Sequence, residues 1–132
     1  MGRAARALCP AGAPLTSRAV RLRQAGTNVA RFDCWANPIE ADRVVFPIVL
    51  EIQSDLLHAF AERVVVPLAV AGAIPGMTER FNPSVQLVGA AYRLHPLGIA
   101  VFHRHDLREH IGHARTQALE IETALDMLLR GY

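Results

Sequence analysis

The C-terminal stretch TQALEIETALDMLLRGY (residues 116–132) decides the fold, because it has an unbroken helical pattern. Its apolar residues recur at the three- and four-residue spacing that places side chains on one face of a helix: Ala118, Ile121, Leu125 and Leu128, with Ala124 and Leu129 widening the stripe. Leu119 and Met127 fall outside the stripe. The pattern therefore predicts a C-terminal helix that buries one face and leaves some apolar surface for a partner.

The end of this predicted helix carries signals of its own. Arg130 stands where a cation suits a helix C-terminus, and Gly131 is the first residue that interrupts the pattern. Tyr132 then ends the chain with an aromatic ring and a carboxylate. Two interpretations follow: the helix presents the chain end to a partner, or it simply packs on a sheet.

Length and composition predict one folded domain. The chain has 132 residues, of which 52% are apolar, enough for a sizeable core. The longest apolar run, residues 64–74, contains Pro and Gly and is shorter than a membrane span. We expect a soluble protein that does not enter a membrane.

The charge of the chain is uneven. All 14 basic residues are Arg, and residues 1–28 hold five of them and no acidic residue. The remaining nine Arg face 12 Asp and Glu, so the body is net acidic. The pattern is unlike that of a nucleic-acid-binding domain, which carries a basic patch or stripe.

Residues 1–28 read as an N-terminal extension, and residues 29–132 as the folded domain. The extension is rich in Ala, Arg and Gly and has no continuous apolar segment, which argues against a secretory signal. We interpret it as disordered or as an over-long start; a transit peptide is the lesser alternative. Cys9 and Cys34 fall one in each part, which suits neither a disulfide framework nor a zinc site and favours a reducing cytoplasm.

The body reads as a series of short strands followed by the helix. Residues 30–36 alternate apolar and polar, residues 63–70 are rich in Val, and residues 85–94 and 99–103 are expected to form a hairpin around His95–Gly98. A second strand is expected over 44–53. Pro47 and Pro67 indicate that the strands containing them lie at a sheet edge or are irregular at these residues. Gly89 indicates a β-bulge, and the polar segment 107–114 is expected to be a solvated connection before the helix. This pattern favours a small barrel-like sheet capped by the helix.

No catalytic or cofactor motif stands out. The chain lacks G-x-S-x-G, H-E-x-x-H and a Gly-rich phosphate loop. Five of the six histidines lie between residues 95 and 113, but their spacing matches no common metal-ligand set, so we expect solvated histidines. Ser54, Asp55 and His58 could form a Ser/His/Asp catalytic relay, but three residues this close in sequence are weak evidence for one, because triad members meet in space and need an oxyanion site. Ser54 and Asp55 are more typical of a turn. We expect no catalytic residues, no metal and no cofactor.

Five blocks resemble the CcdB family, the toxins of type II toxin–antitoxin pairs. They are RFDCWANP (31–38), LEIQSDLL (50–57), RVVVPLA (63–69), FNP (81–83) and IETALDMLLRGY (121–132). The second and last blocks are the specific ones. The resemblance runs from about Val29 to Tyr132, in order and with similar gaps.

The resemblance implies a fold and a function. The fold is an SH3-like antiparallel β-barrel with a small inserted sheet and a long C-terminal helix, working as a homodimer. The function is to bind the DNA gyrase A subunit and trap the covalent cleavage complex, without chemistry by the toxin itself. A cognate CcdA-like antitoxin neutralises the toxin, and the pair represses its operon, so operator DNA is contacted only through the antitoxin complex.

The resemblance also implies the functional residues. Gyrase contacts map onto the helix end: Asp126, Arg130, Gly131 and Tyr132. A turn linked to toxicity maps onto Ser54, Leu56 and Leu57. One departure is Arg130, where the best-known member has Trp before its closing Gly.

Two alternatives stay open. The first is an mRNA endonuclease toxin of the same barrel architecture, which needs a cationic groove and a proton-transfer pair; loss of RNA cleavage on mutation of an Arg such as Arg63 would favour it. The second is an inactive relative that only binds antitoxin.

Overall fold

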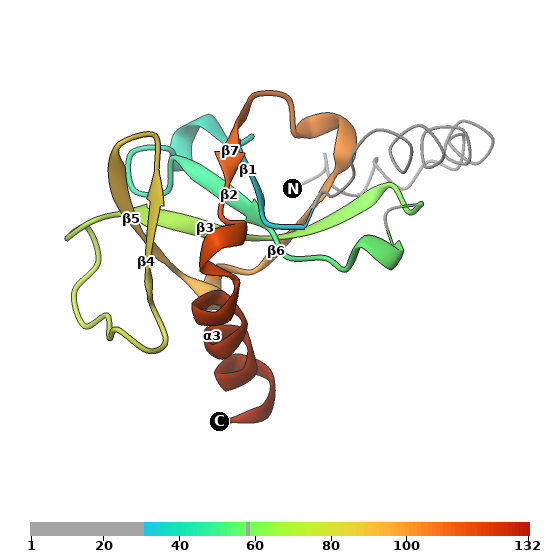
Figure 1. Ribbon diagram of the computed structural model, residues 1–132. Coiled ribbons are helices and arrows are strands. Elements are labelled where there is room, and N and C mark those ends of the chain that lie inside the picture. The colour runs from blue at the N-terminus through green and yellow to red at the C-terminus, as the bar shows by residue number, and fades with distance from the viewer. Residues whose placement is uncertain (1–30, 58) are drawn as a thin grey trace.

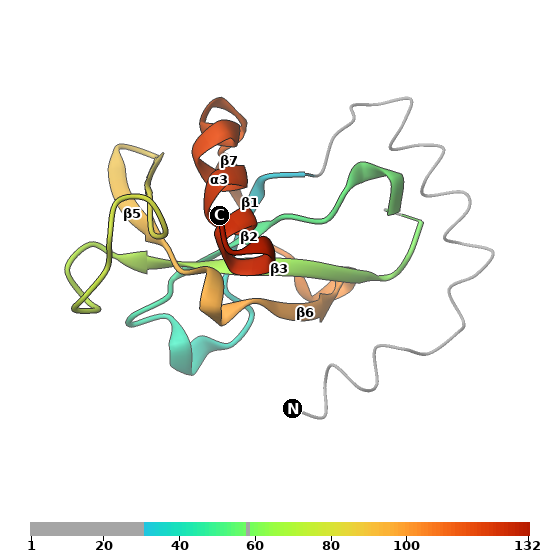
Figure 2. The ribbon, with the colours of Figure 1, turned by 90° about the horizontal axis from the view of Figure 1, so that it is seen from below.

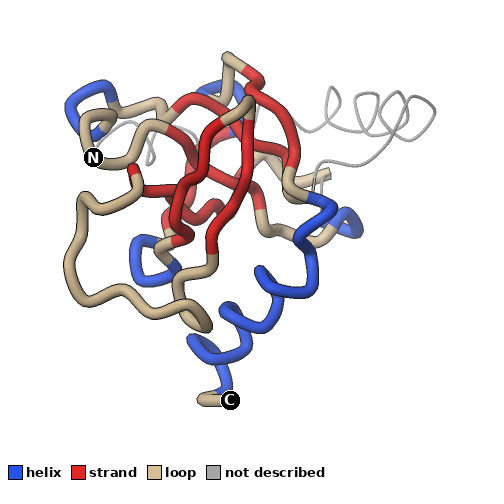
Figure 3. The backbone as a smooth tube through the Cα atoms, turned by 60° about the vertical axis from the view of Figure 1, so that its left-hand side comes forward, coloured by secondary structure: helices blue, strands red, loops and turns tan. Residues whose placement is uncertain are grey.

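In the computed structural model, residues 31–57 and 59–132 are described, and they form one antiparallel sheet with a C-terminal helix (Figure 1). The elements are β1 (Asp33–Ala36), β2 (Ile48–Glu51), β3 (Glu62–Val70), β4 (Ser84–Leu87), β5 (Ala90–Leu94), β6 (Ala100–His103), β7 (His110–His113) and helix α3 (Ala118–Arg130). The strand order is β4-β5-β3-β2-β1-β7, with β6 also paired to β3. The sheet curls into a half-barrel (Figure 3), which confirms the predicted barrel with its terminal helix. The extension predicted for 1–28 lies outside the described residues.

Strand β3 is the centre of the sheet. One edge pairs with β2, and the other pairs first with β6 over Glu62–Val65 and then with β5 over Leu68–Val70. Pro67 lies where the partner changes from β6 to β5, and its carbonyl accepts a hydrogen bond from His95 N–H at 3.0 Å. Proline has no backbone N–H, but between the two pairing segments no strand is placed to accept a hydrogen bond from residue 67, so none is lost. Pro67 therefore occupies an irregular position as predicted, but in a central strand and not at an edge.

The two ends of the sheet, β4 and β7, approach each other. A Cβ built on Gly112 of β7 would lie 3.5 Å from Leu87 Cδ2 of β4. Just beyond β7, the Gln117 amide donates to Ser84 C=O at 2.6 Å and accepts from Gln86 N–H at 2.8 Å. A side-chain amide thus satisfies backbone groups of β4 that would otherwise be open to strand addition.

The sheet buries a core on each face. The larger core, between the concave face and α3, contains buried side chains from β1 to β5 and the helix, among them Cys34, Leu50, Leu68, Leu94 and Ile121. The smaller core on the opposite face is built from Val49, Val65 and Leu107, with Trp35 and Phe102 packed against it. The alternation predicted over 30–36 is confirmed for Cys34, which is buried in the larger core, and Trp35, which faces the other side. The strand itself begins only at Asp33, because residues 31–32 form a turn in which Phe32, also buried in the larger core, has a φ of +70°.

Three strand predictions need correction. The segment 85–94 is itself a hairpin, β4–β5, and β6 pairs with β3 and not with β5. The segment 107–114 is not a solvated connection, since its last part is β7, paired with β1. The strand expected over 44–53 is confined to Ile48–Glu51, because residues 43–45 form a turn, in which Phe46 N–H donates to Asp42 C=O, and Pro47 lies just before the strand.

The β4–β5 turn explains Gly89, which is a turn residue and not a bulge. Val88 and Gly89 have φ of +48° and +76°, the sign that a two-residue type I′ hairpin turn requires at both positions. Val is poorly suited there, because a β-branched side chain in the left-handed region is strained. Its side chain is 78% exposed, so packing does not compensate.

We therefore expect Val88→Asn to stabilise the protein by about 1 kcal/mol, since it creates the preferred Asn-Gly turn. Chemical denaturation measures this as a higher midpoint with an unchanged slope. Gly89→Ala, at the neighbouring position, is expected to lower the midpoint. A lower midpoint for Val88→Asn would contradict the assigned turn.

Helix α3 matches the predicted stripe except at its end. Ile121, Ala124 and Leu125 are buried against the sheet, and Leu119 is 74% exposed as expected. The helical pattern predicts that Leu129 widens the stripe, but its side chain is 73% exposed. The last turn of α3 extends past the sheet (Figure 1), so a residue there remains exposed even when it lies on the apolar side of the helix.

Candidate functional site

The C-terminal end of α3 projects away from the sheet. The helix contacts the core from Ala118 to Leu125, and its last turn extends beyond the strands (Figure 1). On the sheet side, Arg31 ties the helix to the body: its NH1 lies 2.8 Å from Glu122 Oε2, and its Nε donates to Ile52 C=O. The helix base is therefore anchored while its tip is free of other elements.

Gly131 ends the helix in a left-handed conformation with φ of +88°. Its N–H donates to the carbonyls of Asp126 and Met127, at 3.1 and 3.2 Å. This bond pattern satisfies carbonyls that the helix end leaves open, and the left-handed geometry suits glycine because it has no Cβ. Nothing lies within 4 Å of a Cβ built at Gly131, so its outer side is open space.

The four residues assigned to the helix end by resemblance lie together and are accessible. Arg130 Nε lies 3.8 Å from Asp126 Oδ1, an ion pair one helical turn apart whose side chains are 62% and 50% exposed. Tyr132 is 65% exposed. A solvated pair of this kind contributes little to stability, on the order of 0.5 kcal/mol or less. These charges are therefore available to a partner at small cost to the fold.

The turn at Ser54, Leu56 and Leu57 connects β2 to β3. Ser54 Oγ accepts from Leu56 N–H at 3.1 Å, and its carbonyl accepts from Leu57 N–H at 2.9 Å. Asp55 Oδ1 accepts from Arg31 N–H at 3.1 Å. Ser54 and Asp55 therefore shape a turn, as predicted, and His58 of the rejected relay lies outside the described residues.

The turn presents apolar side chains but does not join the helix end. Leu56 is 92% exposed and Leu57 is 45% exposed. Figures 1 and 2 show this turn near the N-terminal end of β3, apart from the C-terminal end of α3. The two sets of predicted site residues thus form two separate surfaces within one chain.

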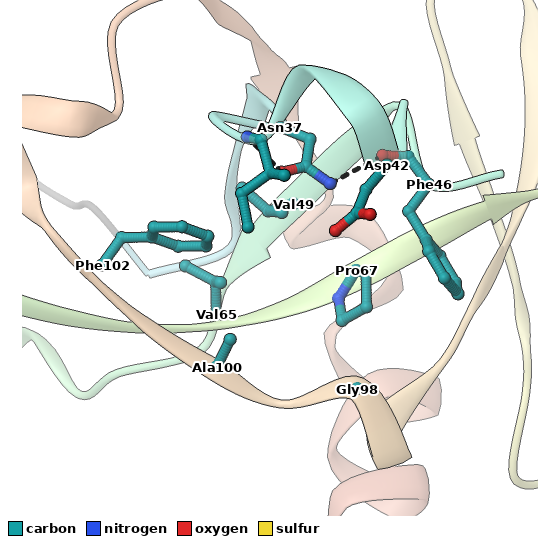
Figure 4. Close-up of a pocket in the computed structure, with 10 residues that line it drawn as sticks. Asn37, Asp42, Phe46, Val49, Val65, Pro67, Gly98, Ala100 and Phe102 are labelled. Carbon is teal, nitrogen blue, oxygen red and sulfur yellow. Dashed lines mark hydrogen bonds between the residues drawn. The ribbon is translucent and has the colours of Figure 1, made fainter. Parts of the chain in front are cut away.

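A small cavity lies on the face of the sheet opposite α3 (Figure 4). Its volume is about 230 Å³, and its walls come from the loop after β1 and from β2, β3 and β6, including Phe46, Val49, Val65, Pro67 and Phe102. Asn37 holds the loop in place by donating to Phe46 C=O at 2.9 Å. Small-molecule sites usually measure about 300–1,000 Å³, so this cavity is below that class.

Cys34 is a structural thiol. Burial in the larger core, with the nearby Asp33 carboxylate as a lesser cause, raises the pKa of Cys34 to about 12. A thiol with that pKa is ionised in only about one molecule in ten thousand at pH 8, and the thiolate is the reactive form. In a Cys9→Ser variant we therefore expect no reaction of native protein with a thiol-specific dye, and full reaction after urea is added. Rapid stoichiometric labelling of the native protein would contradict this.

Arg63 is the wrong residue for probing RNA cleavage. Its side chain and that of Glu51 are 4% and 3% exposed, and Arg63 Nε lies 3.7 Å from Glu51 Oε2. Arg63 also donates to the backbone carbonyls of Phe60 and Glu62. A guanidinium held in this way supports the fold and is inaccessible to a polynucleotide.

The histidines are distributed over three surroundings. His95 stacks on Phe46, with ring centroids 5.4 Å apart, and His103 lies beside His105 at 4.6 Å. His110 and His113 belong to β7. Within residues 31–57 and 59–132, no three His, Cys, Asp or Glu side chains are placed to hold a metal ion.

No helix in the described part of the chain is long and apolar enough to cross a membrane.

Comparison with known proteins identifies the family. The model of the CcdB protein family matches residues 31–131. A search of the curated proteins finds no match. Among solved structures, an endoribonuclease from a Mycobacterial species is similar with a TM-score of 0.56 and 15% identity, covering 78% of this chain and 92% of that one. At that identity the likeness concerns the fold alone. The family match, which spans most of the chain, shows that the protein belongs to the CcdB family, whose members are toxins of toxin–antitoxin systems.

Proposed function

We propose that this protein poisons DNA gyrase by binding its A subunit through the C-terminal end of α3 and trapping the cleavage complex. The observation that carries the proposal is the geometry of that end: a helix anchored at its base presents Asp126, Arg130, Gly131 and Tyr132 clear of the sheet. Aromatic and Arg side chains are the residue types that dominate interface hot spots. Gly131 allows close approach of a partner because no atoms lie outside its backbone.

The proposed action requires binding and no chemistry by the toxin. Gyrase itself forms the covalent DNA link, and the toxin stabilises that state by binding it more tightly than the resealed state. Arg130 replaces the family Trp, and a guanidinium can donate to carboxylates in a planar, bidentate manner. We therefore expect this chain to select a gyrase surface with an acidic group opposite Arg130.

The toxin is proposed to act as a cytoplasmic homodimer, controlled by a CcdA-like antitoxin that also provides the operator contacts. The exposed Leu119 and Leu129 give the outer face of α3 an apolar character that suits association. Sedimentation equilibrium measures the dimer directly. A monomer at micromolar concentration would contradict this part of the proposal.

Isothermal titration of the full chain with purified gyrase A subunit tests the proposed binding. Saturable binding that is lost in Tyr132→Ala, and kept in Val44→Ser, which alters a side chain that is 84% exposed in the loop before β2, is the expected result. Binding of antitoxin without binding of gyrase would instead identify an inactive, antitoxin-binding relative.

A further inference from the structure

A β-bulge places two histidines of β7 on the same side of the sheet. Asp33 of β1 pairs with His113 and Trp35 pairs with His110, so Ile111 and Gly112 together stand opposite Cys34. Residues three apart in a regular strand face opposite sides, but the extra residue of the bulge restores them to one side. Cys34 and Ile111 pack in the core beneath α3, and Trp35 packs on the other face. The two histidines and Asp33 therefore lie on the face away from α3.

Asp33 links His110 to a guanidinium. Asp33 Oδ1 lies 3.4 Å from His110 Nε2 and 3.2 Å from Arg115 NH1. The Asp33 side chain is 14% exposed, whereas those of His110 and Arg115 are 49% and 41% exposed. The indole of Trp35 meets the His110 ring edge-on, with centroids 5.0 Å apart. His110 is thus fixed on its inner side and open to solvent on its outer side.

These contacts assign distinct chemical properties to the histidines. A carboxylate beside Nε2 favours the tautomer protonated there, which leaves Nδ1 of His110 as a proton acceptor. His113 is different, because its Nδ1 accepts from Arg115 N–H at 3.2 Å. A neutral His113 therefore carries its proton on Nε2 and is a hydrogen-bond donor. The group comprises one proton acceptor, one carboxylate, one cation and one N–H donor.

The segment 103–115, which supplies three of the four residues of this group, differs in charge from the body. Residues 103–115 contain three Arg and four His against two acidic residues, although the body as a whole is net acidic. Arg and neutral His N–H groups suit phosphate oxygens, and Arg binds them in a bidentate manner. The local composition favours a phosphodiester as the ligand.

We propose that Asp33, His110, His113 and Arg115 form a site that cleaves single-stranded RNA, on the face of the sheet opposite α3. His110 Nδ1 takes the proton of a ribose 2′-OH, and the 2′ oxygen attacks the adjacent phosphorus. The bond from phosphorus to the 5′ oxygen breaks, and the 5′ oxygen keeps the electron pair and takes a proton from water. The hydroxide formed from that water takes the proton from His110 Nδ1, which regenerates the neutral base and a water molecule.

The products are a 2′,3′-cyclic phosphate and a free 5′-OH. Arg115 and the His113 N–H stabilise the charge that develops on the non-bridging oxygens. Asp33 acts as a positioning residue, because it orients both His110 and Arg115. A single strand is required, since the 2′ oxygen must come into line with the departing 5′ oxygen, which a base-paired helix prevents.

The test is cleavage of a labelled, mixed-sequence single-stranded RNA by the full chain in EDTA, with the products' ends determined. EDTA is appropriate because the step uses protein groups only. His110→Gln and Arg115→Gln are expected to lower the rate at least ~100-fold, the usual effect of losing a general base or a charge-stabilising group. His105→Gln, an exposed histidine outside the group, is the matched control and is expected to cleave normally. Circular dichroism checks that each variant is folded.

Deletion of Gly131 and Tyr132 separates this site from the helix end. We expect the deleted protein to cleave RNA at the normal rate, and we expect RNA with 2′-deoxyribose to resist cleavage. Absence of cleavage by folded wild-type protein would overturn the proposal, as would equal cleavage by His110→Gln, or products with 5′-phosphate ends. None of these results bears on gyrase binding, which is measured with a different partner and different variants.

Discussion

Deletion of Gly131 and Tyr132 is expected to abolish gyrase poisoning while leaving the folded domain intact. The deleted residues follow the last helical residue, Arg130, and belong to neither core. Losing an aromatic anchor together with its backbone contacts is expected to weaken binding to the A subunit at least ~30-fold, the effect of one hot-spot residue. Titration calorimetry measures the affinity, and circular dichroism with sedimentation measures the fold and the oligomeric state.

Gly131→Glu is expected to give the same loss and has a matched control. Gly131 and Gly89 both have positive φ, +88° and +76°, and neither has an atom within 4 Å of a built Cβ. Gly89→Glu therefore introduces the same charge and comparable backbone strain, about 1–2 kcal/mol, at the β4–β5 turn. Poisoning is expected to persist in Gly89→Glu and to disappear in Gly131→Glu. Equal poisoning by both variants would rule out the helix end as the contact.

Arg63→Ala is expected to destabilise the protein by about 3–5 kcal/mol, because it leaves the buried Glu51 carboxylate without the guanidinium beside it. Both side chains are almost completely inaccessible, so water cannot replace the lost partner. Urea denaturation measures the change in the free energy of unfolding. For comparison, Arg130→Ala removes an exposed ion pair and is expected to change stability by about 0.5 kcal/mol or less.

Replacing both Arg63 and Glu51 distinguishes the contribution of the ion pair from the cost of burying one charge without its partner. Arg63→Met with Glu51→Leu removes both charges and keeps similar volumes, so we expect stability within about 1–2 kcal/mol of wild type. A loss of 3 kcal/mol or more in the double variant would mean that the ion pair itself, and not the cost of one isolated charge, determines stability at this site.

Local sequence patterns predict the elements whose side chains follow one period. The C-terminal helix is predicted because its apolar residues keep a helical spacing over 118–128, and β3 is predicted from its Val-rich run. Pairing partners are harder to predict, because they depend on contacts between distant segments. β6 follows β5 in sequence yet pairs with β3, which changes partner at Pro67. The sequence pattern within β3 does not indicate that its pairing partner changes from β6 to β5.

Irregular backbone explains most of the remaining differences. The bulge in β7 disrupts the two-residue alternation of 110–113, so this strand resembles a polar connection. The β4–β5 turn places Val at a position that favours Asn or Gly, so the usual turn signal is missing. Leu129 shows that a helical stripe predicts burial only where another element covers the helix.

The two candidate sites differ in how far sequence could predict them. The helix end is a contiguous segment, so resemblance to the family was sufficient to place Asp126, Arg130, Gly131 and Tyr132 on one surface. Asp33 and Arg115 are 82 positions apart, and only strand pairing brings them together. The concentration of His and Arg over 103–115 was the available signal, but without the bulge it has no defined geometry.

The most direct test of the gyrase proposal is a cleavage assay with the full chain, cognate gyrase, ATP and supercoiled plasmid, stopped with detergent and protease. The helix-end account predicts linear DNA that appears only when the toxin is present and is absent with the protein lacking Gly131 and Tyr132. Supercoiled DNA without linear product, from a folded and dimeric toxin, would contradict it.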